Sequence, residues 1–475
     1  MLFNSIVFIG FAFLFFFFYS FVKKLPLNFR WGYLTIASLI FYGWWDWRYI
    51  SLLLLTGLID FAAGLWIHRY PRFRKLLLLA SLSSNLLVLI GFKYIFFIVS
   101  GVDNLIEWSG ISLTAPSVPE LFSVLPVGIS FYTFQSMSYT VDVYRGSLSP
   151  TRNVLHFFAF LSLFPQLVAG PIVRAGDLLP QLKRVRNVSE TERWHGLRLI
   201  ALGYFKKTVL ADNIAPFVNS AFSNDLHNTS SPYWWLVMIG FALQIYFDFS
   251  GYSDIARGLA KWMGIHFKVN FNHPYLATSF KNFWSRWHIS LSTWFRDYIF
   301  IPLGGSRKGT ARSYINLWIT MLLSGLWHGA GLNYILWGGL HASYLTVEKV
   351  TNWPAALSRL KAGKLLAGVI VFLLTTMAWV FFRAPDISTG AYVIQHLFSF
   401  TNSGDWGVYD VRFTGIFFIC LGVMMEISWA LSTRFVRARE TTLAIRSFEV
   451  VQVSLMVGAS IFFRGTGAQF IYFQF

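Results

Sequence analysis

The sequence predicts an all-α polytopic membrane protein, on the strength of its composition, its long apolar runs and the placement of its basic residues. Of the 475 residues, 55% are hydrophobic and only 13% are charged. Soluble domains carry about 25% charged residues, and a water-soluble fold of this size cannot hide so much apolar surface. The composition therefore excludes a soluble multidomain enzyme. Because 19% of the residues are aromatic, it also excludes a disordered chain.

The apolar runs are long and unbroken. A membrane-spanning helix needs about 20 apolar residues, whereas a porin-like barrel would show short alternating segments. Two of the runs are short, so we expect eleven or twelve transmembrane helices. In chain order the runs cover residues 5–22, 31–45, 50–67, 76–99, 121–141, 199–218, 233–249, 315–327, 332–347, 365–382, 413–431 and 450–463.

The basic residues predict the orientation of these helices. Of the 39 Lys and Arg, 32 fall in six segments, and only four lie in the intervening loops. Cytoplasmic loops are enriched in Lys and Arg, so we expect these segments in the cytoplasm and the N-terminus outside. The net charge of +18 thus reflects membrane orientation and not nucleic-acid binding, because it is spread over alternate loops. The six segments are 23–30, 68–75, 145–198, 257–312, 349–364 and 434–446.

Two regions are expected to enter the membrane without crossing it. Residues 154–173 are apolar but have basic loops on both sides, and they contain Pro165, Gly170 and Pro171. A broken backbone at membrane depth is tolerated only where protein or a cavity covers it, so we expect a re-entrant segment. Residues 257–312 alternate aromatic with charged residues, and we expect them to lie along the cytoplasmic face or dip into it.

A histidine lies between two apolar runs, in the segment SGLWHGAGLNYILWGGLHA (324–342). An imidazole can take a proton from a hydroxyl near neutral pH, and glycines such as Gly325 and Gly329 allow a close approach of backbone or ligand. His328 is therefore a candidate general base. A structural histidine that bridges two helices is an equally good interpretation of this segment alone.

A second cluster lies at residues 272–305, where Trp287 and other tryptophans alternate with Arg286, His288 and Arg296. Its arginines could bind the phosphates of a cytoplasmic donor. Trp and Arg are also ordinary anchors at a membrane interface, and for most of these residues we favour that role. For His288 we favour a functional role.

Ionisable groups inside the apolar runs need partners. Asp248 and Asp254 are expected to hold a helix end or to pair with Arg residues of the next region. Buried Arg or Lys residues are the expected partners of Asp60, Asp212 and Glu426. Lys206 and Lys207 indicate that the protein interior near them contains water or is lined by polar groups. The only cysteine, Cys420, excludes an intrachain disulfide and a thiolate metal site. The histidines lack a carboxylate spacing typical of a metal site, so no metal is expected.

At these motifs the sequence resembles the membrane-bound O-acyltransferase family, in particular its bacterial alginate O-acetylation branch. The resemblance extends over positions 125–475, and the hydrophobic profile of residues 1–124 also fits. We therefore expect one transmembrane domain over 1–475, with N-terminal helices at 1–124 and a catalytic core at 125–475. The matching stretches are LPVGISFYTFQSMSYTVDVYRG (125–146), LFPQLVAGPIVR (163–174), FDFSGYSDIARG (247–258), NFNHPYLATSFKNFWSRWHISLSTWFRDYIFIPLGG (270–305), GLWHGAGLNYILWGGLHA (325–342) and FIYFQF (470–475).

The resemblance implies a fold and a mechanism. The transmembrane helices would form a ring, with re-entrant and amphipathic helices around a central tunnel. His328 would be the catalytic residue, and His288 a second catalytic residue on the cytoplasmic side of the tunnel. No cofactor would be bound, and acetyl-CoA would be the acyl donor. The residues expected to bind substrate are Arg286, Trp287, Arg296, Trp327 and Asn333.

The resemblance also implies a location and partners. The chain would be a multi-pass protein of the bacterial cytoplasmic (inner) membrane, in contact with the lipid bilayer. Its acceptor would be a hydroxyl on a periplasmic or extracellular SGNH-type acetyltransferase, which then esterifies an extracellular polysaccharide such as alginate. Three alternatives stay open: D-alanyl or other acyl transfer from a carrier protein, a transporter for a lipid-linked sugar, and a scaffold that recruits the external enzyme.

Overall fold

The computed structural model describes residues 1–110, 116–168, 170–184, 186–223, 226, 228–400, 409–436, 443–465, 467 and 470–471. The regular secondary structure of these residues is all helical. The described chain divides into two compact units. The first contains residues 1–196 and 256–268, and the second contains residues 197–255 and 269–475. The predicted all-α class is confirmed.

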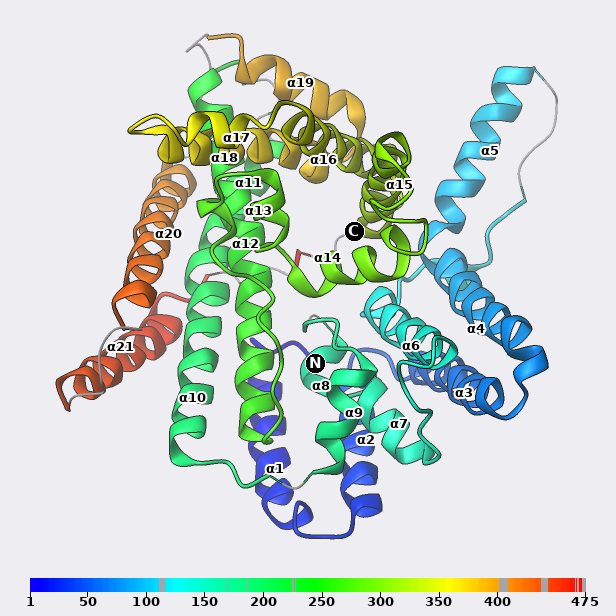
Figure 1. Ribbon diagram of the computed structural model, residues 1–475. Helices are drawn as coiled ribbons and strands as arrows, with labels where there is room; N and C mark the ends of the chain where they lie inside the picture. Colours follow the sequence, from blue (N-terminus) through cyan, green and yellow to red (C-terminus); the bar gives the residue numbers. More distant parts are fainter. Residues whose placement is uncertain are drawn as a thin grey trace. The chain divides into compact units, whose positions relative to one another are not determined.

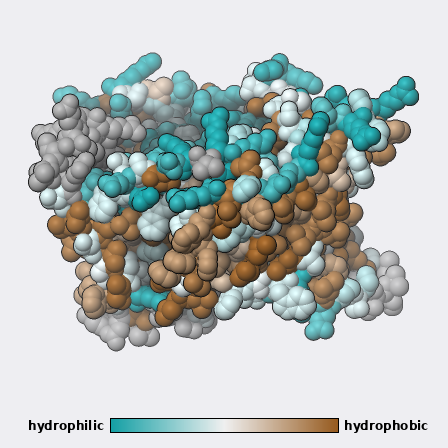
Figure 2. All heavy atoms as spheres, turned by 90° about the horizontal axis from the view of Figure 1, so that it is seen from below, coloured by the Kyte–Doolittle hydropathy of each residue, from teal (hydrophilic) through white to brown (hydrophobic). Residues whose placement is uncertain are grey.

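Four helical segments of the described chain are long and apolar enough to cross a membrane: Arg48–Arg69, Pro71–Ser109, Gly363–Arg383 and Val411–Leu431. Two shorter helices, Ile6–Val22 and Ser447–Phe462, are also apolar. Figure 2 shows hydrophobic side chains over much of the visible surface, with hydrophilic side chains gathered apart from them. A polytopic membrane protein needs this separation, because lipid and water contact different parts of its surface.

The first unit contains the N-terminal helices. In Figure 1, α3 lies beside α4 and α6, and α2 packs on α7. The 3₁₀ turn η1 joins α3 to α4, and the π-helical segment η2 joins α4 to α5. The helices are α1 (Ile6–Val22), α2 (Leu27–Gly43), α3 (Arg48–Arg69), η1 (Pro71–Phe73), α4 (Arg74–Leu89), η2 (Ile90–Tyr94), α5 (Ile95–Ser109), η3 (Glu120–Phe122), α6 (Ile129–Tyr144), α7 (Val154–Leu161), α8 (Phe164–Leu167) and α9 (Ala175–Lys183).

Helices α10 and α12 contribute residues to both units, and the remaining helices belong to the second unit. Here α11 packs on α20, α15 on α16, and α16 on α18. The helices are α10 (Glu190–Tyr204), η4 (Phe205–Ala211), α11 (Asp212–Ser223), α12 (Ser231–Trp262), η5 (Pro274–Leu276), α13 (Phe280–Trp284), α14 (Ile289–Phe295), η6 (Arg296–Phe300), α15 (Thr310–His328), α16 (Leu332–Thr351), α17 (Trp353–Leu357), α18 (Gly363–Arg383), α19 (Ile387–Leu397), α20 (Tyr409–Val436) and α21 (Leu443–Phe462).

Both segments that were expected not to cross the membrane are broken into short helices. The first contains α7 and α8, which have eight and four residues. At about 1.5 Å per residue neither can cross a bilayer core of about 30 Å. Asn153 begins α7 by accepting a hydrogen bond from the His156 backbone N–H, and Pro165 lies in the first turn of α8. The second contains α13, α14 and η6, with five, seven and five residues.

Several helices differ in extent from the apolar runs that predicted them. In the run at 121–141 the α-helix begins only at Ile129, after Gly128, which adopts a left-handed conformation (φ 75°). The run at 233–249 lies inside α12, which continues to Trp262. Hydropathy therefore located these helices but not their ends, since a helix continues through polar residues when its hydrogen bonds are satisfied.

The buried lysines of the second unit are ion-paired. Lys207 Nζ lies 2.8 Å from Asp212 Oδ1 and 2.9 Å from Asp248 Oδ1. Lys206 Nζ lies 2.7 Å from Asp254 Oδ2. Asp212 thus has the lysine partner that was predicted. Asp248 and Asp254 are paired as expected, but with lysines instead of arginines.

Two other predicted charge pairs are wrong. Asp60 is held in the first unit by the hydroxyls of Ser81 and Ser136 and by the Asn85 amide. In the second unit, Glu426 lies 2.7 Å from His273 Nδ1 and accepts a hydrogen bond from the Tyr246 hydroxyl at 3.2 Å. Polar side chains from other segments of the same unit solvate these carboxylates, so neither relies on a buried Lys or Arg.

Candidate functional site

His328 is the last residue of α15 and is only 2% exposed. The chain then becomes extended at Gly329 and Gly331 before α16 begins. Backbone contacts bring the two helices together, because a methyl group on Gly325 would overlap the Tyr334 carbonyl oxygen. This close approach holds His328 at a buried junction between two helices, as the glycine pattern predicted.

Aromatic rings surround the His328 imidazole. The ring centroids of Trp327, Trp337 and Phe382 lie 4.9, 5.1 and 5.2 Å from that of His328, all edge-on. Such an enclosure restricts water, which strengthens any electrostatic interaction that the imidazole makes. His328 therefore has the surroundings of a histidine that handles a proton away from bulk solvent.

His288 immediately precedes α14 in a backbone conformation that few non-glycine residues adopt, with φ 41° and ψ 55°. Left-handed backbone at a bulky residue persists only where surrounding contacts hold it. The side chain is 1% exposed. Burial lowers the pKa of His288 to about 3, so its imidazole is neutral at physiological pH.

Asn270 selects the tautomer of that neutral imidazole. Its Oδ1 lies 3.3 Å from His288 Nδ1 and accepts the Ser290 backbone N–H at 3.1 Å. Its Nδ2 donates to Ser253 Oγ at 3.2 Å. The Ser290 backbone N–H can only donate, so it fixes the orientation of the amide. Since Oδ1 can only accept, Nδ1 of His288 carries the proton and Nε2 is the basic nitrogen.

Trp327 connects the two histidines, since its ring centroid lies 6.2 Å from that of His288 and 4.9 Å from that of His328. Both predicted catalytic residues therefore belong to one aromatic cluster of the second unit, although 39 residues separate them in the sequence. Trp327 is itself 4% exposed. This predicted substrate-binding residue therefore contacts both histidines.

The other predicted substrate-binding residues have contacts within the protein. Trp287 is buried, with its ring centroid 5.0 Å from that of Trp379. Asn333 donates a hydrogen bond to the Ala384 carbonyl at 2.9 Å, which ties the start of α16 to the end of α18. A role for these two residues in substrate binding stays a prediction.

Both arginines of the cluster are held by neighbouring groups. Arg286 donates hydrogen bonds to Asn282 Oδ1 at 3.1 Å and to the Asn272 carbonyl at 3.2 Å. Arg296 Nε lies 2.6 Å from Asp297 Oδ1, and this hydrogen-bonded carboxylate raises the pKa of Arg296. Arg296 is exposed. Their contact with donor phosphates likewise stays a prediction.

His341 on α16 is a buried histidine that the sequence patterns did not single out. Its side chain is fully buried, and neither ring nitrogen has a hydrogen-bond partner within the part of the chain that the structure describes. The ring lies 4.9 Å from Trp337, which also contacts His328. The sequence signal was its place in the same Gly- and Trp-rich segment as His328.

The chain is similar to known proteins over most of its length. The membrane-bound O-acyltransferase (MBOAT) family matches residues 146–384. A probable alginate O-acetylase AlgI of Pseudomonas putida is 40% identical over 386 residues, which is 80% of this chain and 76% of that protein.

Two further relatives have other names. A peptidoglycan O-acetyltransferase of Helicobacter pylori is 35% identical over 76% of this chain and 72% of its own length. A teichoic acid D-alanyltransferase of Bacillus subtilis is 30% identical over 50% of this chain and 62% of its own length. All these relatives are named as enzymes that move acyl groups. The matched family and the identity over most of the chain make this multi-pass membrane protein an enzyme, a member of the membrane-bound O-acyltransferase family.

Proposed function

We propose that this enzyme takes an acetyl group from cytoplasmic acetyl-CoA and transfers it through the membrane to a hydroxyl acceptor outside. The product would serve the O-acetylation of an extracellular polysaccharide such as alginate. The observation that carries this proposal is the enclosure of His328 and His288 in one aromatic cluster around Trp327. The similar proteins named as O-acetylase and O-acetyltransferase support acetyl as the group moved.

In this proposal His328 is the general base. Its imidazole takes the proton of the acceptor hydroxyl as the oxygen attacks the thioester carbonyl carbon. The new C–O bond forms, the C–S bond breaks, and the leaving thiolate takes the proton back from the imidazolium. A thioester is activated enough for a base and correct orientation to suffice.

His288, from the cluster at residues 272–305, would be the second functional group of the site. Its basic Nε2, left by the hydrogen bond of Nδ1 to Asn270, is suited to accept a hydrogen bond from a donor or acceptor group. Asn270 would act as a positioning residue, because it acts through His288. Trp327, which contacts both histidines, would exclude water from the transfer path.

The external acceptor defines the expected partner and location. The chain would lie in the bacterial inner membrane with its N-terminus outside, as the distribution of Lys and Arg indicates. An SGNH-type acetyltransferase outside the membrane would receive the acetyl group and pass it to the polysaccharide. The specificity for the polymer would then belong to the partner.

Radiolabelled acetyl-CoA supplied to the cytoplasmic face of membranes that hold this protein and its external partner tests the proposal. We expect label on the partner or polymer. The variant His328→Ala should reduce transfer about 100-fold to 10,000-fold, the usual contribution of general base catalysis. The matched control is His68→Ala, which replaces an exposed histidine and should transfer label like wild type. All variants are compared at equal membrane abundance.

Different results of this experiment separate the alternative functions. Equal label with wild type and His328→Ala would reject the catalytic assignment and favour a scaffold. Label that appears only when an acyl carrier protein replaces acetyl-CoA would favour D-alanyl or related transfer. The similarity to a teichoic acid D-alanyltransferase makes this the second candidate.

A further inference from the structure

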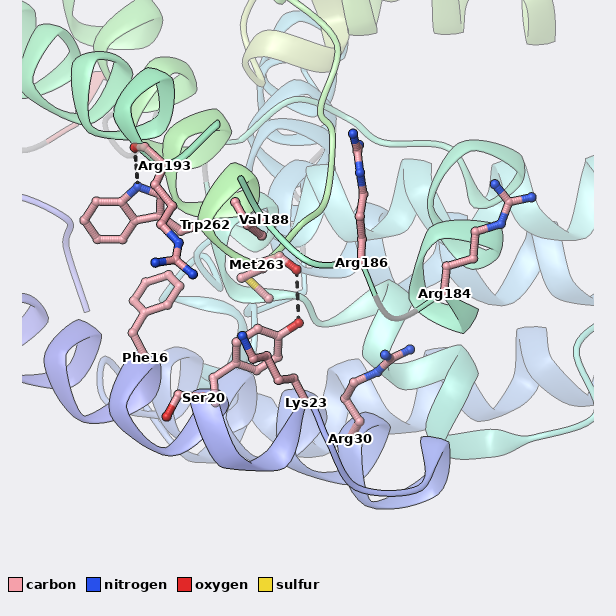
Figure 3. Close-up of a pocket in the computed structure, with 11 residues that line it drawn as sticks. Phe16, Ser20, Lys23, Arg30, Arg184, Arg186, Val188, Arg193, Trp262 and Met263 are labelled. Atoms are coloured by element: carbon pink, nitrogen blue, oxygen red, sulfur yellow. Dashed lines mark hydrogen bonds between the residues drawn. The ribbon is translucent and has the colours of Figure 1, made fainter. Parts of the chain in front are cut away.

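The first unit contains a cavity of about 370 Å³ whose lining combines five basic side chains with aromatic and apolar ones. A volume of roughly 300–1,000 Å³ is typical of small-ligand sites. All lining residues belong to the first unit, from α1, α2, the segment before α10, α10 itself and the end of α12 (Figure 3).

The charge of this lining is one-sided. Its basic residues are Lys23, Arg30, Arg184, Arg186 and Arg193, and the described residues that line it include no Asp or Glu. Neighbouring groups engage two of the arginines: Arg186 lies 2.8 Å from Glu192 Oε1, and Arg30 donates to the Leu182 carbonyl.

Three basic side chains of the lining remain, Lys23, Arg184 and Arg193, and the inference uses Lys23 and Arg193. No ion pair of Lys23 or Arg193 occurs within the described chain. Figure 3 draws both side chains among the residues that line the cavity. Several cations gathered without compensating acids repel one another, so this site favours an anion.

Hydrogen bonds hold the cavity wall in place. The Tyr19 hydroxyl donates to the Met263 carbonyl at 3.1 Å, and Trp262 Nε1 donates to the Arg193 carbonyl at 2.9 Å (Figure 3). Both bonds join segments that are more than 60 residues apart in the sequence. The second bond uses the Arg193 backbone and leaves its guanidinium available. The cavity is therefore built by tertiary contacts that involve Tyr19 and Trp262.

The apolar surface beside the cavity indicates the kind of anion. Phe16 and Ser20 of α1 line the cavity. On the adjoining stripe of α1, Phe13, Phe17 and Phe21 are 72, 52 and 59% exposed. Residues four apart share one face of a helix, so these rings form an apolar stripe that runs along α1 beside the cavity. A soluble nucleotide has no apolar chain that could cover this stripe, whereas the acyl chains of a lipid could.

We infer that this cavity binds the phosphate of an anionic phospholipid headgroup, with the acyl chains lying along the Phe13, Phe17 and Phe21 stripe of α1. Lys23 and Arg193 contact the phosphate, and Phe16 and Trp262 pack against the glycerol region. Basic residues next to an apolar helix are the recognised chemistry of anionic-lipid sites.

Native mass spectrometry of the full chain in neutral detergent tests this inference. Dioleoyl-phosphatidylglycerol and dioleoyl-phosphatidylcholine have the same acyl chains but differ in net charge. We expect the first to bind at least 10-fold more tightly. The double variant Lys23→Gln/Arg193→Gln should weaken its binding by roughly 30-fold, since each cation near an anionic lipid contributes about 1 kcal/mol. The charge-retaining variant Lys23→Arg/Arg193→Lys should keep most of the affinity and show that the site still folds.

A matched control variant and a soluble competitor distinguish lipid binding at this cavity from general charge attraction and from the binding of soluble phosphates. Arg359→Gln/Lys361→Gln removes the same charge from exposed positions of another segment and should bind like wild type. Equal binding of both lipids, or equal loss in both Gln double variants, would overturn the inference. Displacement of the lipid by coenzyme A or by inorganic phosphate would also overturn it, because the site would then bind soluble phosphates.

Discussion

Asn270 holds His288 through a hydrogen-bond distance of 3.3 Å between its Oδ1 and His288 Nδ1. The same oxygen accepts the backbone N–H of Ser290 and its hydroxyl, so one side chain stabilises both the imidazole and the start of α14. This contact holds a histidine whose backbone lies in the left-handed region. Asn270 thereby connects the local backbone to the orientation of a candidate catalytic group.

Replacement of Asn270 is therefore expected to impair acyl transfer. In Asn270→Leu the imidazole loses the acceptor that selects its tautomer, and we expect transfer to fall about 10-fold to 100-fold, as for other residues that orient a functional histidine. The measurement is the initial rate of label transfer at matched protein abundance, over a range of pH.

The conservative variant and an exposed site provide controls. Asn270→Asp keeps an acceptor oxygen and should retain more activity than Asn270→Leu. Asn104→Leu changes an exposed asparagine of α5 and should behave like wild type. If Asn270→Leu has the wild-type rate and pH profile, Asn270 does not position His288.

The close contact of α15 and α16 leads to a prediction about glycine. A methyl group on Gly338 would overlap the Met321 carbonyl oxygen, as one on Gly325 would overlap that of Tyr334. We expect Gly325→Ala and Gly338→Ala to push the helices apart and displace His328, with at least a 100-fold loss of transfer.

The same α16 offers a control at Gly339, where the nearest atom is 3.7 Å from an added Cβ. Gly339→Ala should keep its activity and its melting temperature, and a loss there as large as in Gly338→Ala would contradict the role of packing.

His341 and His156 make a matched pair of buried histidines. His156 has partners on both ring nitrogens, Thr151 Oγ1 and the Leu179 carbonyl, each at 2.9 Å. Neither nitrogen of His341 has such a partner within the described residues. Loss of satisfied buried hydrogen bonds costs about 1–3 kcal/mol, whereas replacing an unsatisfied polar group by an apolar one is near neutral.

We therefore expect His156→Phe to lower the melting temperature in detergent, and His341→Phe to leave it unchanged or raise it. The measurement is thermal unfolding of the purified variants in the same detergent. A larger drop for His341→Phe than for His156→Phe would show that the His341 ring makes hydrogen bonds in the folded protein.

The Lys207 cluster is expected to contribute to stability through charge balance. Lys207→Met leaves Asp212 and Asp248 as buried carboxylates without their cation, and breaking such a pair costs about 3–5 kcal/mol. We expect a large drop in melting temperature, and a partial recovery when Asp248→Asn is added. Removal of the exposed pair in Asp297→Asn should change the free energy of unfolding by at most about 1 kcal/mol. Additive effects of Lys207→Met and Asp248→Asn would contradict the coupling.

The sequence by itself determined the class of the protein, because a bilayer demands long apolar helices and a bias of Lys and Arg that hydropathy and counting can detect. It also located the two broken segments and the motifs around His288 and His328. The choice of partners depended on the tertiary structure. Asp60 was expected to meet a cation and instead meets the hydroxyls of Ser81 and Ser136 from two other helices. Likewise, only the packing of distant segments brings Trp327 against His288 and leaves His341 fully buried. Hydropathy is a property of single residues and their neighbours in sequence, whereas contacts between helices depend on which faces meet, and no local pattern encodes that pairing.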